Sequence, residues 1–246
     1  MCEKCRLETP SNQVQPSRRG LLQFLGTATL GLALAGTGNA KEARRPPKPQ
    51  NVVSPDASLE LLIKGNDRYV DGISRRHDFK HEREALVGGQ NPYAGILSCA
   101  DSRIAPEYAF DSGRGDLFVC RVAGNFANSD TIASMEYAVA MLDTPLIVVL
   151  GHDSCGAVSA TIKSLKDNTT LPGHLPSLVT SLTPAVTAAS GKPGDPLDNA
   201  IRQNVIDNVA KLKSATPILS SAVEQRKLKI VGGIYHLKDG RVEMIS

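Results

Sequence analysis

Short apolar runs alternate along the chain with longer stretches in which apolar positions recur at helical spacing. The run PLIVVLG at 145–151 has no polar side chain, which is typical of a parallel strand covered on both faces. After the turn Lys238-Asp239-Gly240, RVEMI predicts an edge strand. By the same criteria we expect strands at 93–98, 117–122 and 227–237, and helices at 131–142, 155–166, 175–190 and 197–213.

Strands that alternate with helices predict an α/β fold with right-handed crossovers. We expect a mostly parallel central sheet of about four strands plus an antiparallel edge strand, flanked by helices. Residues 167–196 are rich in Pro, Gly, Ser and Thr, and predict an extended surface loop plus a short helix. Residues 56–72 predict an amphipathic helix that Gly65 interrupts, and the sequence indicates no docking site for it in its own chain.

The first forty residues resemble a twin-arginine export signal. Arg18 and Arg19, within SRRGLL, precede an apolar run of about 16 residues, which is short of the roughly 20 that a spanning helix needs. The run ends in small residues at 38–40, a plausible cleavage site. An uncleaved membrane anchor is the alternative. Cys2 and Cys5 form a CxxC in this leader, to which we assign no function in the mature chain.

These features divide the chain into three parts. We predict a signal peptide at 1–40, a Pro-rich linker at 41–55 and one folded domain at 56–246. The expected partner of the leader is the twin-arginine export machinery, and the expected location is the periplasm or another compartment outside the cytoplasm.

Composition is that of an ordinary soluble globular protein, with 41% hydrophobic and 22% charged residues. The net charge of the chain is +3. Four basic and two acidic residues in 1–40 account for +2, which leaves +1 on the remainder. So small a charge, without a long Lys/Arg run, argues against a nucleic-acid partner.

Soft metal ligands stand where two predicted strands end. Cys99 follows the strand at 93–98, and His152 and Cys155 follow the strand at 145–151 in an H-x-x-C spacing. Open α/β sheets place their sites at the carboxyl ends of strands. Two thiolates and an imidazole suit zinc, and three protein ligands leave a fourth position open for catalysis. Taken singly, the cysteines also fit buried thiols or a disulfide, and His152 a core histidine.

At these residues the sequence resembles the β-class carbonic anhydrases. CADSRI, FVCRVAGN and GHDSCGA are similar to the three motifs of that family, in order and spacing, and the likeness extends over about 56–246, including GNxRY at 65–69. Val122 departs from the asparagine common in the second motif. The resemblance implies one Zn²⁺ per chain and reversible hydration of carbon dioxide to bicarbonate and a proton.

The resemblance also assigns roles beside the metal. Zinc-bound hydroxide would attack carbon dioxide, oriented by Asp101, while Arg103 would hold Asp101 off the metal in a charge-assisted pair. Two thiolate ligands predict activity that rises into the alkaline range. The bicarbonate-regulated branch has Trp where this chain has Ile96, so we expect Asp101 to stay off zinc, although Arg121 remains a candidate anion ligand.

Four further residues match the lining of the substrate pocket in the plant-type branch. They are Gln90, Phe118, Tyr137 and Gly156. For Phe118 and Tyr137 the alternative is core packing, and for Gln90 it is a turn. The family pairs into dimers whose pockets draw on both subunits, so we expect a homodimer or a dimer of dimers, with 56–72 as the arm that reaches the partner.

Other functions compatible with the motifs remain open. A catalytically silent zinc or assembly protein would have lost a ligand or the Asp101–Arg103 pair, and none is lost. A thiol redox protein would use Cys99 and Cys155 and bind no zinc. A hydrolase of carbon disulfide would share the same ligands.

Overall fold

A twisted five-stranded sheet forms the centre of the computed structural model, which describes residues 53–245. The strand order is β2-β1-β3-β4-β5, with β1 to β4 parallel and β5 antiparallel to β4. The predicted fold class is confirmed. The strands are β1 (Ala94–Ser98), β2 (Leu117–Arg121), β3 (Leu146–His152), β4 (Lys229–Tyr235) and β5 (Val242–Met244).

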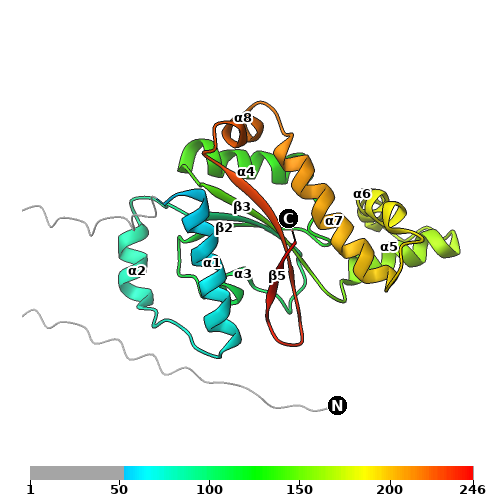
Figure 1. The fold of residues 1–246 in the computed structure, drawn as a ribbon, viewed down its shortest axis with the longest axis horizontal. Coiled ribbons are helices and arrows are strands. Elements are labelled where there is room, and N and C mark those ends of the chain that lie inside the picture. The colour runs from blue at the N-terminus through cyan, green and yellow to red at the C-terminus, as the bar shows by residue number, and fades with distance from the viewer. Residues whose placement is uncertain (1–52, 246) are drawn as a thin grey trace, which may run out of the picture. The chain divides into compact units, whose positions relative to one another are not determined.

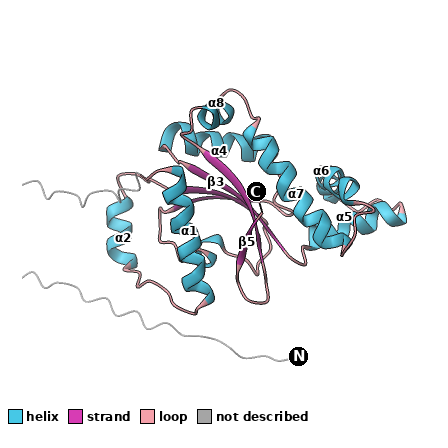
Figure 2. Cartoon of the chain, viewed as in Figure 1, coloured by secondary structure: helices cyan, strands magenta, loops and turns pink. Residues whose placement is uncertain are grey.

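Helices enclose this sheet on both faces (Figures 1 and 2). Helices α1 and α3 pack on one face, beside α2, which buries no residue, while the later helices, mainly α5, α6 and α7, form a layer on the other. The helices are α1 (Pro55–Val70), α2 (Phe79–Leu86), α3 (Pro106–Ala109), α4 (Ser129–Leu142), α5 (Gly156–Asp167), α6 (Leu175–Ala189), α7 (Pro196–Lys213) and α8 (Ile218–Glu224).

The unbroken apolar run of β3 fills two separate cores. Ile147 and Val149 join the cluster under α4, α5, α6 and α7, whereas Val148 and Leu150 join the cluster under α1 and α3. Successive side chains of a strand point to opposite faces, so a strand covered twice needs apolar residues throughout. At the end of β3, a Cβ at Gly151 would lie 2.7 Å from Val205 of α7, so glycine permits this close approach of helix and strand.

The helix expected at 175–190 is confirmed as α6, whereas the expectation of an extended surface loop over most of 167–196 was wrong. Helix α6 occupies 15 of these residues and buries Leu182, Ala185 and Ala189. Its hydroxyl groups bond to carbonyls one turn earlier, as Thr183 Oγ1 does to Val179 O at 2.7 Å. The polar composition therefore lies on a packed helix, because a Ser or Thr side chain can satisfy itself within the helix.

Three helices were not predicted. Helix α3 has four residues and α8 has seven, which is too short for a periodic pattern to stand out. Helix α2 has eight residues and buries none of them. Its Asp78 N-cap, which accepts a hydrogen bond from the His81 amide at 3.2 Å, was the remaining signal in the sequence.

Helix α1 has a docking site in its own chain, contrary to expectation. Leu62 is 1% exposed and packs in the cluster beside β3. The Asn66 amide donates to Ala109 O at 2.9 Å and to Gly240 O at 2.8 Å, and its oxygen accepts from the Val242 amide at 2.8 Å. One buried asparagine thus ties α1 to α3 and to the β4–β5 turn.

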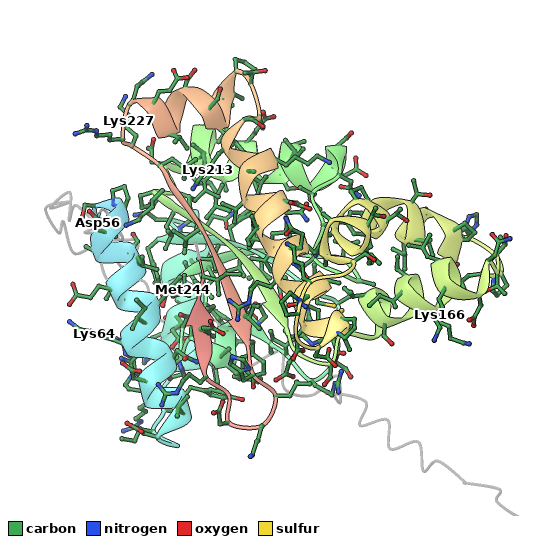
Figure 3. All side chains as sticks on the ribbon, turned by 45° about the vertical axis from the view of Figure 1, so that its right-hand side comes forward. Asp56, Lys64, Lys166, Lys213, Lys227 and Met244 are labelled. Carbon is green, nitrogen blue, oxygen red and sulfur yellow. The ribbon has the colours of Figure 1, made fainter. Side chains whose placement is uncertain are left out.

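The glycine in α1 serves this packing. A Cβ at Gly65 would collide with the carbonyl of Phe110. Gly65, which interrupts the apolar stripe of α1, therefore lies where this helix closely approaches the backbone that follows α3. The charged side of the helix faces outward, and Figure 3 shows Lys64 pointing away from the sheet, with Met244 on β5 beside the helix.

The predicted signal peptide and almost all of the linker lie outside the described residues, as do Cys2, Cys5, Arg18 and Arg19. Within 53–245, no helix combines the length and the apolar character needed to cross a membrane.

Candidate active site

The structure brings the three predicted ligands together at one edge of the sheet. Cys99 follows β1, His152 ends β3 and Cys155 is the N-cap of α5. Because β1 and β3 are adjacent and parallel, their carboxyl ends meet. The three ligand atoms lie within 4.8 Å of one another, and the residues are 3%, 0% and 1% exposed.

The donor atoms fit a metal ion. His152 Nδ1 lies 2.8 Å from Asp153 O, which can only accept, so Nδ1 carries the proton and Nε2 is left as a lone-pair donor. Nε2 is buried and has no hydrogen-bond partner within the described part of the chain. An unsatisfied buried nitrogen is costly, and a metal ion shared with the two thiols would satisfy it.

The spacing of the sulfurs distinguishes a metal site from a disulfide. Cys99 Sγ and Cys155 Sγ lie 4.0 Å apart. Two thiolates on one tetrahedral zinc would be about 3.8 Å apart, whereas bonded sulfurs lie about 2 Å apart. The three residues therefore fit zinc, and both cysteines are free thiols in this structure.

Hydrogen bonds favour the thiolate of Cys99. The Cys155 thiol donates to Cys99 Sγ and, against the effect of burial, lowers the pKa of Cys99, helped by the Gly124 amide at 3.3 Å. The same contact raises the pKa of Cys155. One proton therefore leaves the two cysteines readily, while the second is held by the same contact. A metal ion binds thiolates, so its binding would displace the remaining proton.

Asp101 and Arg103 form a bidentate pair beside the ligands. Arg103 Nε donates to Asp101 Oδ1 at 2.9 Å and Nη2 donates to Oδ2 at 2.7 Å, and the Arg103 amide also donates to Oδ1 at 2.9 Å. These contacts hold the pKa of Asp101 well below its usual range, so the carboxylate is ionised at any working pH. Asp101 Oδ2 lies 3.9 Å from His152 Nε2.

Arg121 has a role that sequence reasoning missed. It ends β2 opposite Ser98, and its Nε donates to Cys99 O at 2.9 Å. Its Nη2 donates to Asp101 O at 2.7 Å and to Ile104 O at 2.8 Å. Nε and Nη2 thus hold the backbone of the CADSRI loop. The only signal in the sequence was an arginine at the end of a strand.

The four predicted pocket residues lie in two places. Gly156 directly follows Cys155 at the start of α5 and is exposed. Phe118 pairs with Gly95, four residues before Cys99, which is about 13 Å along the strand. The Phe118 and Tyr137 rings lie 6.2 Å apart, Tyr137 is 51% exposed, and Gln90 is exposed before β1. Within one chain only Gly156 adjoins the ligands.

Fold and site together define an α/β protein with a Cys-His-Cys cluster that could hold a metal ion at the ends of parallel strands. The sequence matches the family described as carbonic anhydrase over residues 94–242. It is 40% identical over 189 residues to carbonic anhydrase 2 of Mycobacterium tuberculosis, across 76% of this chain and 91% of the relative. It is 39% identical over 194 residues to a carbonic anhydrase of Mycolicibacterium smegmatis, across 78% of this chain and 94% of that protein.

Solved structures agree. The β-carbonic anhydrase CcaA aligns with a TM-score of 0.59 at 29% identity, across 76% of this chain and 95% of that one. A β-carbonic anhydrase of Sordaria macrospora, from a pair described as tetrameric, has the same fold, with a TM-score of 0.61 at 23% identity, across 77% of this chain and 98% of that one. The chain belongs to the carbonic anhydrase family, in its β class, and its relatives support carbonic anhydrase activity.

Proposed function

We propose that this protein hydrates carbon dioxide reversibly to bicarbonate and a proton, with one zinc per chain held by Cys99, His152 and Cys155. The observation that carries the proposal is the buried, unpartnered Nε2 of His152 beside two thiols. When bound, zinc supplies Lewis-acid activation of a water molecule. Water loses a proton, its oxygen bonds to the carbon of carbon dioxide, and the proton passes to buffer.

Asp101 and Arg103 orient this reaction. The carboxylate accepts a hydrogen bond from the attacking water through Oδ2, on the side nearest His152 Nε2. Arg103 occupies both carboxylate oxygens and so opposes direct ligation of the metal by Asp101. Because Asp101 is ionised throughout, the pH dependence comes from the activated water, and the charge of two thiolates places the rise in activity on the alkaline side.

We propose that the chain belongs to the plant-type branch of the family. Ile96 is fully buried in β1 at the position where the bicarbonate-regulated branch has Trp. The bidentate Asp101–Arg103 pair supports an enzyme whose Asp101 stays off the metal.

A second chain would complete the substrate pocket. Phe118 and Tyr137 lie away from the ligands of their own chain, on β2 and α4, and Gln90 is exposed in the segment that precedes β1. Apolar side chains are exposed on α4, including Met141 at 69%. We propose a homodimer, alone or in a dimer of dimers, in which these residues line the pocket of the partner's metal site.

Co-expression of two inactive chains tests this shared pocket. Cys155→Ser removes the metal site of one chain, and Tyr137→Ala removes the pocket contribution of the other. With random pairing, half of the dimers are mixed and each has one complete site, so about a quarter of the wild-type activity returns. Cys155→Ser with Asp101→Asn is the control and restores nothing, since both changes act at the metal site of their own chain. Failure of the first pair to recover would show that the pocket lies within one chain.

We further propose export by the twin-arginine pathway to the periplasm or another extracytoplasmic compartment. Its support is the SRRGLL motif and the apolar run that follows it. That pathway carries folded cargo, which would allow the metal to bind before the thiols meet an oxidising compartment.

Replacing Arg18 and Arg19 together by lysine is expected to leave the protein in the cytoplasm, as measured by cell fractionation. Arg6→Lys, in the same leader, is the control and should be exported normally. Export of the double variant at the wild-type level would contradict the proposed signal.

Two alternatives make different predictions. A thiol redox protein would bind no zinc and would form a reversible disulfide between Cys99 and Cys155. A hydrolase of carbon disulfide would bind zinc and release sulfide. Stopped-flow hydration of carbon dioxide, with zinc measured on the same sample, distinguishes all three.

A further inference from the structure

A buried polar network on α7 lies beside the candidate metal centre. Asn204 and Asn208 are 2% and 6% exposed, and Lys211 completes the same face of the helix. The Asn208 amide donates to Asn204 Oδ1 at 2.9 Å, which fixes the orientation of both side chains. Buried amides are costly unless fully bonded, so the partners of this network show what it holds in place.

The Asn208 amide also donates to Asn204 O within the helix at 2.7 Å, and the partners outside α7 are backbone groups of one loop, residues 123–128. Asn204 Nδ2 donates to Gly124 O at 2.8 Å. Asn208 Oδ1 accepts from the Ala127 amide at 2.7 Å, and Lys211 Nζ donates to Ala127 O at 2.6 Å. Side chains of α7 therefore hold this loop near both of its ends, at Gly124 and at Ala127.

The loop in turn contacts a predicted metal ligand. The Gly124 amide donates to Cys99 Sγ at 3.3 Å, and Asn204 binds the carbonyl of the same glycine. Gly124 has a φ of +86°, and a Cβ there would lie 2.9 Å from Leu182. Both observations require a glycine at the position whose amide contacts the sulfur. The conformation of the loop 123–128 sets the direction of the Gly124 N–H group, and side chains of α7 hold that conformation.

We infer that Asn204 and Asn208 are positioning residues of the metal centre: they fix the loop 123–128 so that the Gly124 amide stays directed at Cys99 Sγ. The inference rests on the proposed function, in which Cys99 is a zinc ligand. An N–H···S bond withdraws charge from a thiolate and orients it. Its loss therefore loosens the ligand and changes the charge that Cys99 donates to the metal.

Asn204→Ala and Asn204→Asp in the full chain test the inference, with Gln203→Ala as the control on the same helix. Aspartate keeps the acceptor for Asn208 and removes the donor to Gly124, so it tests the contact if the alanine variant folds poorly. We expect zinc affinity, measured by chelator competition, to fall about 10-fold in both. We also expect faster hydrogen exchange at 123–128 in metal-free protein, and a displaced thiolate-to-cobalt charge-transfer band.

A purely structural role gives a different result. Both Asn204 variants would then lose thermal stability, while their zinc affinity, loop exchange and cobalt band would match Gln203→Ala, and the inference would be overturned. Failure of the wild-type chain itself to bind zinc would contradict the proposed function, and this inference with it. Normal zinc binding by the wild type together with unchanged affinity in both variants contradicts the inference alone.

Discussion

Cys155→Ser is expected to abolish metal binding and, with it, carbon dioxide hydration. A serine hydroxyl stays protonated at neutral pH and is a poor zinc ligand, so two ligands remain in a buried site. We expect less than about a tenth of a zinc per chain after dialysis, and a loss of at least about 1,000-fold in kcat/KM. Metal analysis and stopped-flow kinetics on the same sample measure both.

Cys120→Ser is the matched control, because Cys120 is the other free cysteine among residues 53–245 and stands in β2, outside the ligand cluster. It should keep a full complement of zinc and near-normal turnover. If Cys155→Ser retained one tightly bound zinc per chain, Cys155 would not be a ligand and the assigned site would be wrong.

Asp101→Asn is expected to keep zinc and lose most turnover. The variant leaves all three ligands intact but removes the negative charge, and an amide group can turn a donor instead of an acceptor towards the attacking water. Misplacing a reacting group by about 1 Å can cost about 100-fold, so without this orienting hydrogen bond kcat should fall by at least about 100-fold while zinc content stays at one per chain.

Glu107→Gln supplies the comparison, since it removes one exposed carboxylate six positions further along the chain without touching the dyad. It should behave as the wild type. Full activity of Asp101→Asn would refute the role given to this carboxylate, even if the zinc site were correct.

The sheet and the clustering of Cys99, His152 and Cys155 could be predicted because each strand has a local signal and each of these residues stands at or just after a strand end. The β3 run is apolar at every position since both faces are covered, and parallel strands bring Cys99 and His152 to one edge. The helix at 175–190 was predicted, but the extended loop expected around it was wrong. Ser and Thr indicate loops by composition, whereas in α6 they bond to their own helix and Leu182 anchors it to the core.

The supports of the site could not be predicted, because they depend on contacts between distant positions. Asn204 binds Gly124 across 80 positions of sequence, and its helical pattern alone gives no indication of a loop partner. Likewise, Arg121 was considered as an anion ligand, but its donors hold carbonyls of the loop that follows β1. The docking of α1 through Asn66 has the same origin, since its partners lie 43 and 174 positions away.

The central claim is zinc-dependent hydration of carbon dioxide, and one measurement tests it most directly. Carbon dioxide hydration is followed by stopped flow from pH 7 to 9 on protein beginning at about Lys41, with zinc determined on the same sample. We predict one zinc per chain and a rate that rises with pH across this range. One zinc per chain with no hydration at any pH between 7 and 9 would contradict the account.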